Sequence, residues 1–255
     1  MMIWKSDLYR FGRSKLFYGI MAFTCFLAVT LTMFIRQDIR LGISVFGNLT
    51  AFKSIADIIS IGVQYQKGLG ILIAVLISVF IGQEYLWKTW QNKWIAGKNR
   101  TSIYLSKVLL SSVVSTAIFL LFEIVVLLCS GQMKEIFSVN FVSMIVCSSF
   151  IYAAIGAVLC MISMLIKNSL TSTLVCLGYI LFSETLASLT LNISGISSVT
   201  AKIGDWIIRH SLYGMSLKIN GIGSPENILP IFVNSVAIII LSTVTGTLLF
   251  RKYEL

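Results

Sequence analysis

Six long apolar runs constrain the fold of this chain more than any other feature. They cover 16–35, 61–82, 105–129, 141–166, 170–191 and 230–250. A helix needs about 20 mostly apolar residues to cross the hydrocarbon core of a bilayer. Only 12% of the residues are charged, about half the share in a soluble domain, so few ionic groups remain to coat a water-facing surface. The sequence therefore predicts an all-α integral membrane protein, with six transmembrane helices in a single domain, 1–255.

The Lys and Arg residues between the runs predict the orientation. If the amino terminus is cytoplasmic, the segments on the inner side carry more Lys and Arg than those on the outer side, as the positive-inside rule requires. An even number of spans then returns the carboxyl terminus to the same side. We expect a multi-pass protein with both termini in the cytoplasm, surrounded by membrane lipid.

The segment 1–15 has the pattern of an amphipathic helix. Trp4, Leu8 and Phe11 recur at helical spacing, whereas Lys5 and Arg10 point elsewhere. Such a helix can lie in the membrane interface with its aromatic side buried. We predict an interfacial helix over 1–15, and the alternative is an unstructured basic flank.

Composition argues against several function classes. The net charge is +10, but the basic residues lie in short segments between apolar runs and do not form the single face of a nucleic-acid binder. The five Cys residues lie in or beside apolar runs without CxxC spacing, and the single histidine cannot supply an HExxH motif. We expect no nucleic-acid partner, no metal site and no catalytic residue.

The connection between the second and third runs is the most informative segment. Residues 83–95 contain neither Gly nor Pro, and Lys88 and Lys93 lie off its apolar face. The stripe on that face is formed by Leu86, Trp87, Trp90 and Trp94. This pattern predicts a short amphipathic helix at the cytoplasmic boundary. The alternative is an aromatic belt with a positively charged flank, as at many membrane interfaces.

The order and spacing of four polar residues in this connection resemble a motif of a known family. Glu84, Thr89, Arg100 and Lys107 are similar in type and order to residues between the second and third spans of type-2 ABC exporter permeases. Family members usually have Gly just before the Thr, where this chain has Lys88. The basic leader, the six spans and the long outer segment before the last span also resemble that family.

The resemblance implies half of an ATP-driven exporter in a bacterial plasma membrane. Two copies of the chain, or one copy and a similar permease, would pair above a dimer of ABC ATPase subunits. ATP and Mg²⁺ would bind to that partner, because the chain contains no glycine-rich GK[ST] loop. In size, the chain resembles bacterial permeases that expel amphipathic or antimicrobial peptides. Such permeases act in lantibiotic immunity, bacitracin resistance and phenol-soluble-modulin export.

In such a permease, the helix between spans two and three couples ATP hydrolysis to the spans. The candidate coupling residues are Glu84, Tyr85, Trp87, Lys88, Thr89, Trp90, Lys93, Trp94 and Arg100. In the same family, short re-entrant helices before the last span close the outer mouth. That role falls to Trp206, Ile207 and His210 in this chain, and the alternative is an interfacial helix without gating.

Two acids stand inside apolar runs, Glu123 in the third and Glu184 in the fifth, the latter between Ser183 and Thr185. An ionised carboxylate at the middle of a bilayer is costly, so each should face protein, water or a cation. One interpretation is a polar patch along a translocation path. The other is a protonated acid hydrogen-bonded to a neighbouring helix.

Two rival functions stay open from the sequence. The membrane acids also suit a carrier or channel driven by an ion gradient. A membrane anchor that recruits an ATPase without transport has the same layout. We expect the permease itself not to be an enzyme.

Overall fold

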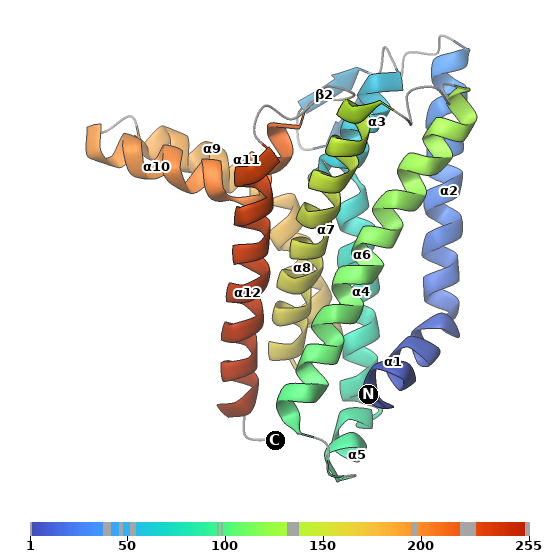
Figure 1. Cartoon of the computed structure of the whole chain (residues 1–255), viewed down its shortest axis with the longest axis vertical. Coiled ribbons are helices and arrows are strands. Elements are labelled where there is room, and N and C mark those ends of the chain that lie inside the picture. Colours follow the sequence, from blue (N-terminus) through green and yellow to red (C-terminus); the bar gives the residue numbers. More distant parts are fainter. Residues whose placement is uncertain are drawn as a thin grey trace.

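The computed structural model describes residues 2–37, 42–45, 48–51, 55–95, 97, 99–131, 138–194, 198–219 and 228–252. Figure 1 shows a bundle of long helices with a helical arm to one side. α1 (Met2–Gly12), α5 (Thr89–Ile95) and the last turn of α12 (Ile228–Lys252) lie at one end. We call this the basal end.

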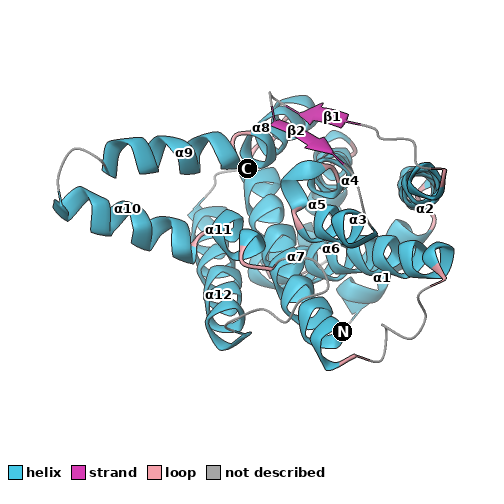
Figure 2. Cartoon of the chain, turned by 90° about the horizontal axis from the view of Figure 1, so that it is seen from above, coloured by secondary structure: helices cyan, strands magenta, loops and turns pink. Residues whose placement is uncertain are grey.

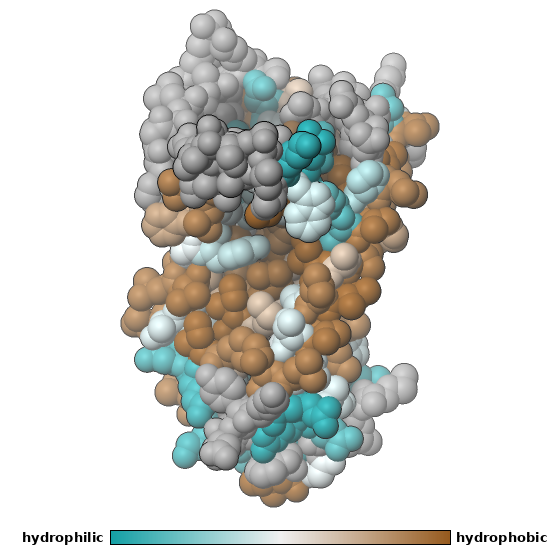
Figure 3. All heavy atoms as spheres, turned by 90° about the vertical axis from the view of Figure 1, so that its left-hand side faces the viewer, coloured by the Kyte–Doolittle hydropathy of each residue, from teal (hydrophilic) through white to brown (hydrophobic). Residues whose placement is uncertain are grey.

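Among the residues that the structure describes, five helices are long and apolar enough to cross a membrane. They are α2 (Lys15–Arg36), α4 (Leu69–Leu86), α6 (Arg100–Ser130), α7 (Val139–Leu165) and α12. On the face drawn in Figure 3, apolar side chains form a broad band between two more polar ends. The chain is therefore a helical, multi-pass membrane protein, as predicted.

The second predicted span differs from the prediction because its first part is a separate helix. α3 (Ile55–Val63) is followed by the 3-10 turn η1 (Tyr65–Lys67), and α4 starts only at Leu69. Gly68 joins them with a φ of 156°, a conformation that residues with a Cβ rarely adopt. The continuous helix of 61–82 is thus replaced by a short buried helix and a later span.

The fifth predicted span, 170–191, is also broken. α8 (Ser169–Leu181) ends at Phe182, and α9 (Ser183–Ser194) leaves the bundle beside α10 (Ser198–His210). The Ser183 hydroxyl bonds the Ile180 carbonyl at 2.7 Å, so a polar side chain competes for backbone groups where the helix stops. Because α8 has only 13 residues, the predicted six-span topology is not confirmed.

The remaining elements are short. α11 (Leu212–Leu217) follows α10. Strands β1 (Gly42–Val45) and β2 (Asn48–Ala51) form an antiparallel pair, with Gly42 opposite Ala51, at the end of the bundle away from α1 (Figure 1). This hairpin is a small addition to the predicted all-α fold.

α6 and α7 form the centre of the bundle. Their rings Phe119 and Tyr152 stack with centroids 4.6 Å apart. A Cβ placed on Gly156 would lie 2.5 Å from the Ser111 carbonyl oxygen, so only glycine allows the two helices to come this close. α12 packs against both α7 and α6, and α4 packs against α8 and α7. This core holds the basal ends of α4 and α6 next to each other.

Candidate functional site

A cluster of five charged side chains joins four elements at the basal end. It consists of Asp7 and Arg10 of α1, Glu84 of α4, Lys93 of α5 and Lys107 of α6. We call these five residues the ion network. Three of them, Asp7, Glu84 and Lys107, are at most 2% exposed.

The amphipathic character of α1 brings its two charged residues to the network. Phe11 is buried between the rings of Phe17 and Phe80, with centroids 4.7 and 4.8 Å away. Asp7 lies one turn earlier on the same side of the helix, and it is buried with Phe11. Leu8, which belongs to the predicted apolar face, is 46% exposed in the bundle.

Each carboxylate of the network contacts more than one cation. Glu84 pairs with Arg10 and with Lys107, and its Oε1 lies 3.5 Å from the Lys93 Nζ. Asp7 pairs with Lys93 at 2.5 Å and with Lys107 at 2.8 Å. The Ser106 hydroxyl donates to the second oxygen of Asp7 at 2.7 Å. Since buried charges are costly unless paired, these contacts hold the four elements together.

Neighbouring cations favour the charged form of Asp7, and an aromatic ring faces two cations of the network. The guanidinium of Arg10 lies 4.6 Å from the centroid of the Phe80 ring, and the Lys107 Nζ lies 5.0 Å from it, within the range of a cation–π interaction. Burial by itself raises the pKa of the Asp7 carboxyl, but Lys107 and Lys93 outweigh burial, and the pKa is lowered from its ordinary value. Asp7 is therefore an anion at neutral pH.

Hydrogen bonds attach the turn before α5 to the same network. The Arg10 Nη1 donates to the Thr89 hydroxyl at 3.2 Å, and that hydroxyl reaches the Glu84 carbonyl at 3.5 Å. The Tyr85 hydroxyl donates to the Met164 carbonyl of α7 at 2.5 Å. Thr89, the first residue of α5, is thus fixed from both α1 and α4.

The predicted helix over 83–95 is two helices in the structure. α4 continues to Leu86, and α5 begins at Thr89 after a turn at Trp87 and Lys88. Lys88 has a φ of 52°, in the left-handed region that favours glycine. Leu86 and Trp87, which lie before α5, are exposed, at 75% and 60%. The side chains of Trp90 and Trp94 lie outside the described residues.

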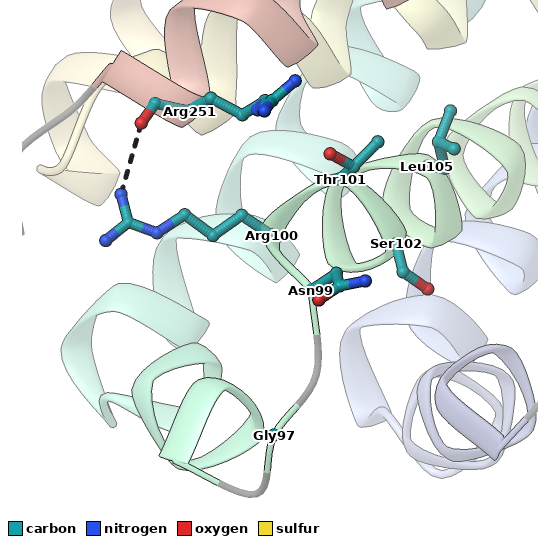
Figure 4. A pocket seen from close by; sticks show the side chains of 7 residues that line it. All are labelled: Gly97, Asn99, Arg100, Thr101, Ser102, Leu105 and Arg251. Atoms are coloured by element: carbon teal, nitrogen blue, oxygen red, sulfur yellow. Dashed lines mark hydrogen bonds between the residues drawn. The ribbon is translucent and has the colours of Figure 1, made fainter.

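The network contains part of the predicted set and adds residues that the sequence did not indicate. Glu84, Thr89 and Lys93 come together with Lys107. Arg100 lies elsewhere: its Nη1 donates to the Arg251 carbonyl of α12 at 3.4 Å (Figure 4). Asp7, Arg10 and Ser106 were missed. The signal for Asp7 and Arg10 was their i, i+3 spacing in the amphipathic leader.

The two membrane acids occupy different environments. Glu123 is 1% exposed, and neither of its carboxyl oxygens has a hydrogen-bond partner in the described part of the chain. It faces Gly62 of α3, where an added Cβ would lie 2.0 Å from the Glu123 Oε1. Glu184 is half-buried at the start of α9, between half-buried Ser183 and exposed Thr185.

Two buried tyrosines, Tyr152 and Tyr65, interact with Glu123 and with Ser183. The Tyr152 hydroxyl donates to the Gly62 carbonyl at 2.5 Å and interacts electrostatically with Glu123 and Tyr65. Tyr65 in turn hydrogen-bonds Ser183. Glu123 and Ser183 therefore each interact with a buried tyrosine, and these two tyrosines interact electrostatically with each other.

The residues predicted for an outer gate lie on α10. Trp206 is 62% exposed and Ile207 is 45% exposed. The Trp206 ring stacks on that of His210, with centroids 4.6 Å apart. The His210 Nδ1 lies 2.7 Å from the Trp206 carbonyl oxygen. α9 and α10 together form the arm beside the bundle in Figures 1 and 2.

Comparisons and geometry together define a broad class of protein. No protein-family model and no curated protein matches the chain. Among the described residues, no group of three or more His, Cys, Asp or Glu side chains could hold a metal ion. What the fold establishes is a multi-pass helical membrane protein, with a buried ion network that joins α1, α4, α5 and α6.

Proposed function

We propose that this chain is the transmembrane subunit of an ABC exporter in a bacterial plasma membrane. A dimer of separate ATPase subunits would drive it, and it would pair with a second copy or a similar permease. The cargo would be an amphipathic or antimicrobial peptide. The observation that supports this most is the attachment of α5 to α1, α4 and α6 through the ion network.

A helix that receives force from another protein needs a docking surface and a rigid attachment. Leu86 and Trp87 before α5 and Ile95 at its end are 75, 60 and 80% exposed, and in this proposal these apolar side chains contact the partner protein. Lys93 joins α5 to Asp7 and Glu84. A displacement of α5 would therefore move α1, α4 and α6 together, because separating buried charges is costly.

In this proposal the chain contributes no group to ATP hydrolysis. ATP and Mg²⁺ bind the partner, and this chain converts the closure of the partner dimer into a movement of its helices. Glu123, Ser183 and the buried tyrosines that interact with them are the polar groups that a peptide crossing the bundle would encounter.

The test is co-purification with an ATPase, using a matched pair of variants. We expect the wild-type chain from its native membrane to bring down vanadate-sensitive ATPase activity, and Leu86→Ser with Trp87→Ser to reduce that activity at least fivefold. Leu229→Ser is the control, because Leu229 is also 75% exposed but lies at the opposite end of α12. Equal ATPase recovery from both variants would contradict docking at α5.

The carrier driven by an ion gradient remains the second candidate because of Glu123. A buried carboxyl with no hydrogen-bond partner among described groups suits the binding of a proton or a cation. Purified chain in liposomes distinguishes the two functions. Transport that needs only an ion gradient, and that Glu123→Gln abolishes, favours the carrier, whereas transport that requires added ATPase favours the exporter.

A further inference from the structure

Three oxygen-bearing groups converge at Gly62, in the half of the bundle away from the basal end. The Tyr152 hydroxyl of α7 donates to the Gly62 carbonyl of α3 at 2.5 Å. The Glu123 carboxyl of α6 lies so close to the same glycine that an added Cβ would collide with its Oε1. Glu123 also interacts electrostatically with Tyr152. A carboxyl, a phenol and a backbone carbonyl therefore meet between three helices.

The register of α6 against α7 adds Ser148 to this group. The two helices run in opposite directions along the close contact that Gly156 allows, and Phe119 stacks on Tyr152. One turn further along α6 from Phe119 is Glu123, and one turn back along α7 from Tyr152 is Ser148. Ser148 therefore lies at the level of Glu123.

These groups are buried, and three of their oxygens have no hydrogen-bond partner. Glu123 is 1% exposed, and Tyr152 and Ser148 are fully buried. Within the described part of the chain, neither carboxyl oxygen of Glu123 nor the Ser148 hydroxyl makes a hydrogen bond, and no Lys or Arg forms an ion pair with Glu123. A buried carboxylate is costly unless a cation neutralises it. The group therefore requires a positive charge that these side chains do not supply.

The set of oxygens indicates which cation supplies this charge. A proton on Glu123 needs a nearby acceptor, and its oxygens have no hydrogen-bond partner among the described groups. Oxygens that share an ion of the size of Ca²⁺ lie about 2.3–2.6 Å from it, so they face one another without bonding each other. Oxygen ligands suit hard cations. Because one carboxylate offsets a single positive charge, a monovalent ion of that size, sodium, fits better than a divalent ion.

We propose that Glu123, Ser148, Tyr152 and the Gly62 carbonyl bind a sodium ion between α3, α6 and α7. Glu123 supplies the negative charge, and the hydroxyl and carbonyl oxygens contribute lone pairs. The sequence predicted no metal site from its Cys and His residues, but one carboxylate with neutral oxygens leaves no such motif. Sodium binding requires only the folded chain, so its failure in a test would leave the proposed exporter unaffected.

The test measures binding of radioactive sodium to the purified full chain in detergent, at alkaline pH, with choline chloride holding the ionic strength constant. We expect one saturable site in the wild-type chain. Glu123→Gln should weaken binding at least about tenfold, because even residues that only support a metal ligand contribute this much. Glu184→Gln is the matched control: it removes a half-buried acid at the start of α9, and it should change binding less than about twofold.

A second variant and a second measurement keep the site testable if Glu123→Gln folds poorly. Ser148→Ala should weaken sodium binding severalfold without changing any charge, and unchanged binding would exclude Ser148 from the site. Sodium should raise the unfolding temperature of the wild type and of Glu184→Gln, because it binds the folded state, and should not change that of Glu123→Gln.

Two results would overturn the proposal. If Glu123→Gln and Glu184→Gln bind sodium equally well, the ion does not bind at Glu123 and the site is refuted. If the wild type binds no sodium, but its unfolding temperature changes with pH and that of Glu123→Gln does not, Glu123 binds a proton and the sodium assignment is wrong.

Discussion

At the residue scale, Glu84 forms more ion pairs than any other side chain of the ion network. It is 2% exposed and pairs with Arg10 of α1 and Lys107 of α6. Removing one partner from a buried ion pair leaves an uncompensated charge, whereas replacing both by apolar groups can be neutral. The role of Glu84 is therefore measurable as a difference between single and double variants.

We predict that Glu84→Gln lowers the free energy of unfolding by roughly 3–5 kcal/mol, the range for a broken buried pair. The double variant Glu84→Met with Lys107→Met should recover much of that loss, because no charge of that pair stays buried. Thermal unfolding in detergent measures both. A double variant less stable than Glu84→Gln alone would show that the charges themselves, rather than their pairing, stabilise the basal end.

Asp7 makes the network sensitive to acid. Its pKa is lowered below the ordinary value of 3.8, because Lys107 and Lys93 outweigh the effect of burial. A carboxyl with a lowered pKa in the folded state stabilises the protein above its unfolded pKa. That contribution is lost as the pH falls through the folded pKa.

We therefore expect the Asp7 contribution to stability to be constant from pH 7 down to about pH 4 and to decline below it. Asp7→Asn should be less stable at neutral pH, and the stability difference from wild type should shrink as the pH falls below 3.8. Chemical unfolding as a function of pH measures this difference. A difference that grows as the pH falls would reverse the sign of the argument.

At the element scale, the contact between α3 and α6 depends on a missing side chain. Gly62 of α3 faces Glu123, and a Cβ there would lie 2.0 Å from the Glu123 Oε1 and 2.9 Å from Phe122. Both Gly62 and Glu123 are buried. The buried acid and the short helix in front of the second span are therefore one structural unit.

Gly62→Ala should destabilise the protein by about 1–3 kcal/mol, as overpacking does. Adding Glu123→Ala should restore part of that loss, since contacting residues are not additive. Gly19→Ala in α2 is the control, because no atom lies within 4 Å of its added Cβ and alanine favours a helix by up to about 1 kcal/mol. If Gly62→Ala and Gly19→Ala have the same free energy of unfolding, the contact with Glu123 does not restrict which side chain position 62 accepts.

Sequence patterns predicted elements well where length and polarity decide the outcome. The five long apolar helices follow from runs that can only be buried in lipid or protein. Breaks inside apolar runs were harder, because they depend on single residues such as Gly68 and Phe182. The turn at Lys88 could not be predicted because no residue in 83–95 is a typical helix breaker. Contacts made by Arg10 and Lys93 hold the backbone there.

At the scale of the whole molecule, the ion network could be predicted only in part. Glu84, Thr89 and Lys107 stood out through a family resemblance, but their partners Asp7 and Arg10 lie more than 70 positions earlier. Sequence periodicity indicates which residues share one face of a helix, but it does not indicate which other helix packs against that face. Arg100, chosen through the same resemblance, contacts Arg251 instead, because the first turn of α6 faces α12 rather than α1.

The separation of Asp7 from its partners also has a consequence for synthesis at the ribosome. Asp7 emerges first, Glu84 and Lys93 follow, and Lys107 completes the set only when α6 begins. Until then, Asp7 and Glu84 lack the buried cation that contacts both of them in the folded chain. A nascent chain that stops before residue 107 lacks this cation, so the complete ion network can form only after the start of α6 has been synthesised.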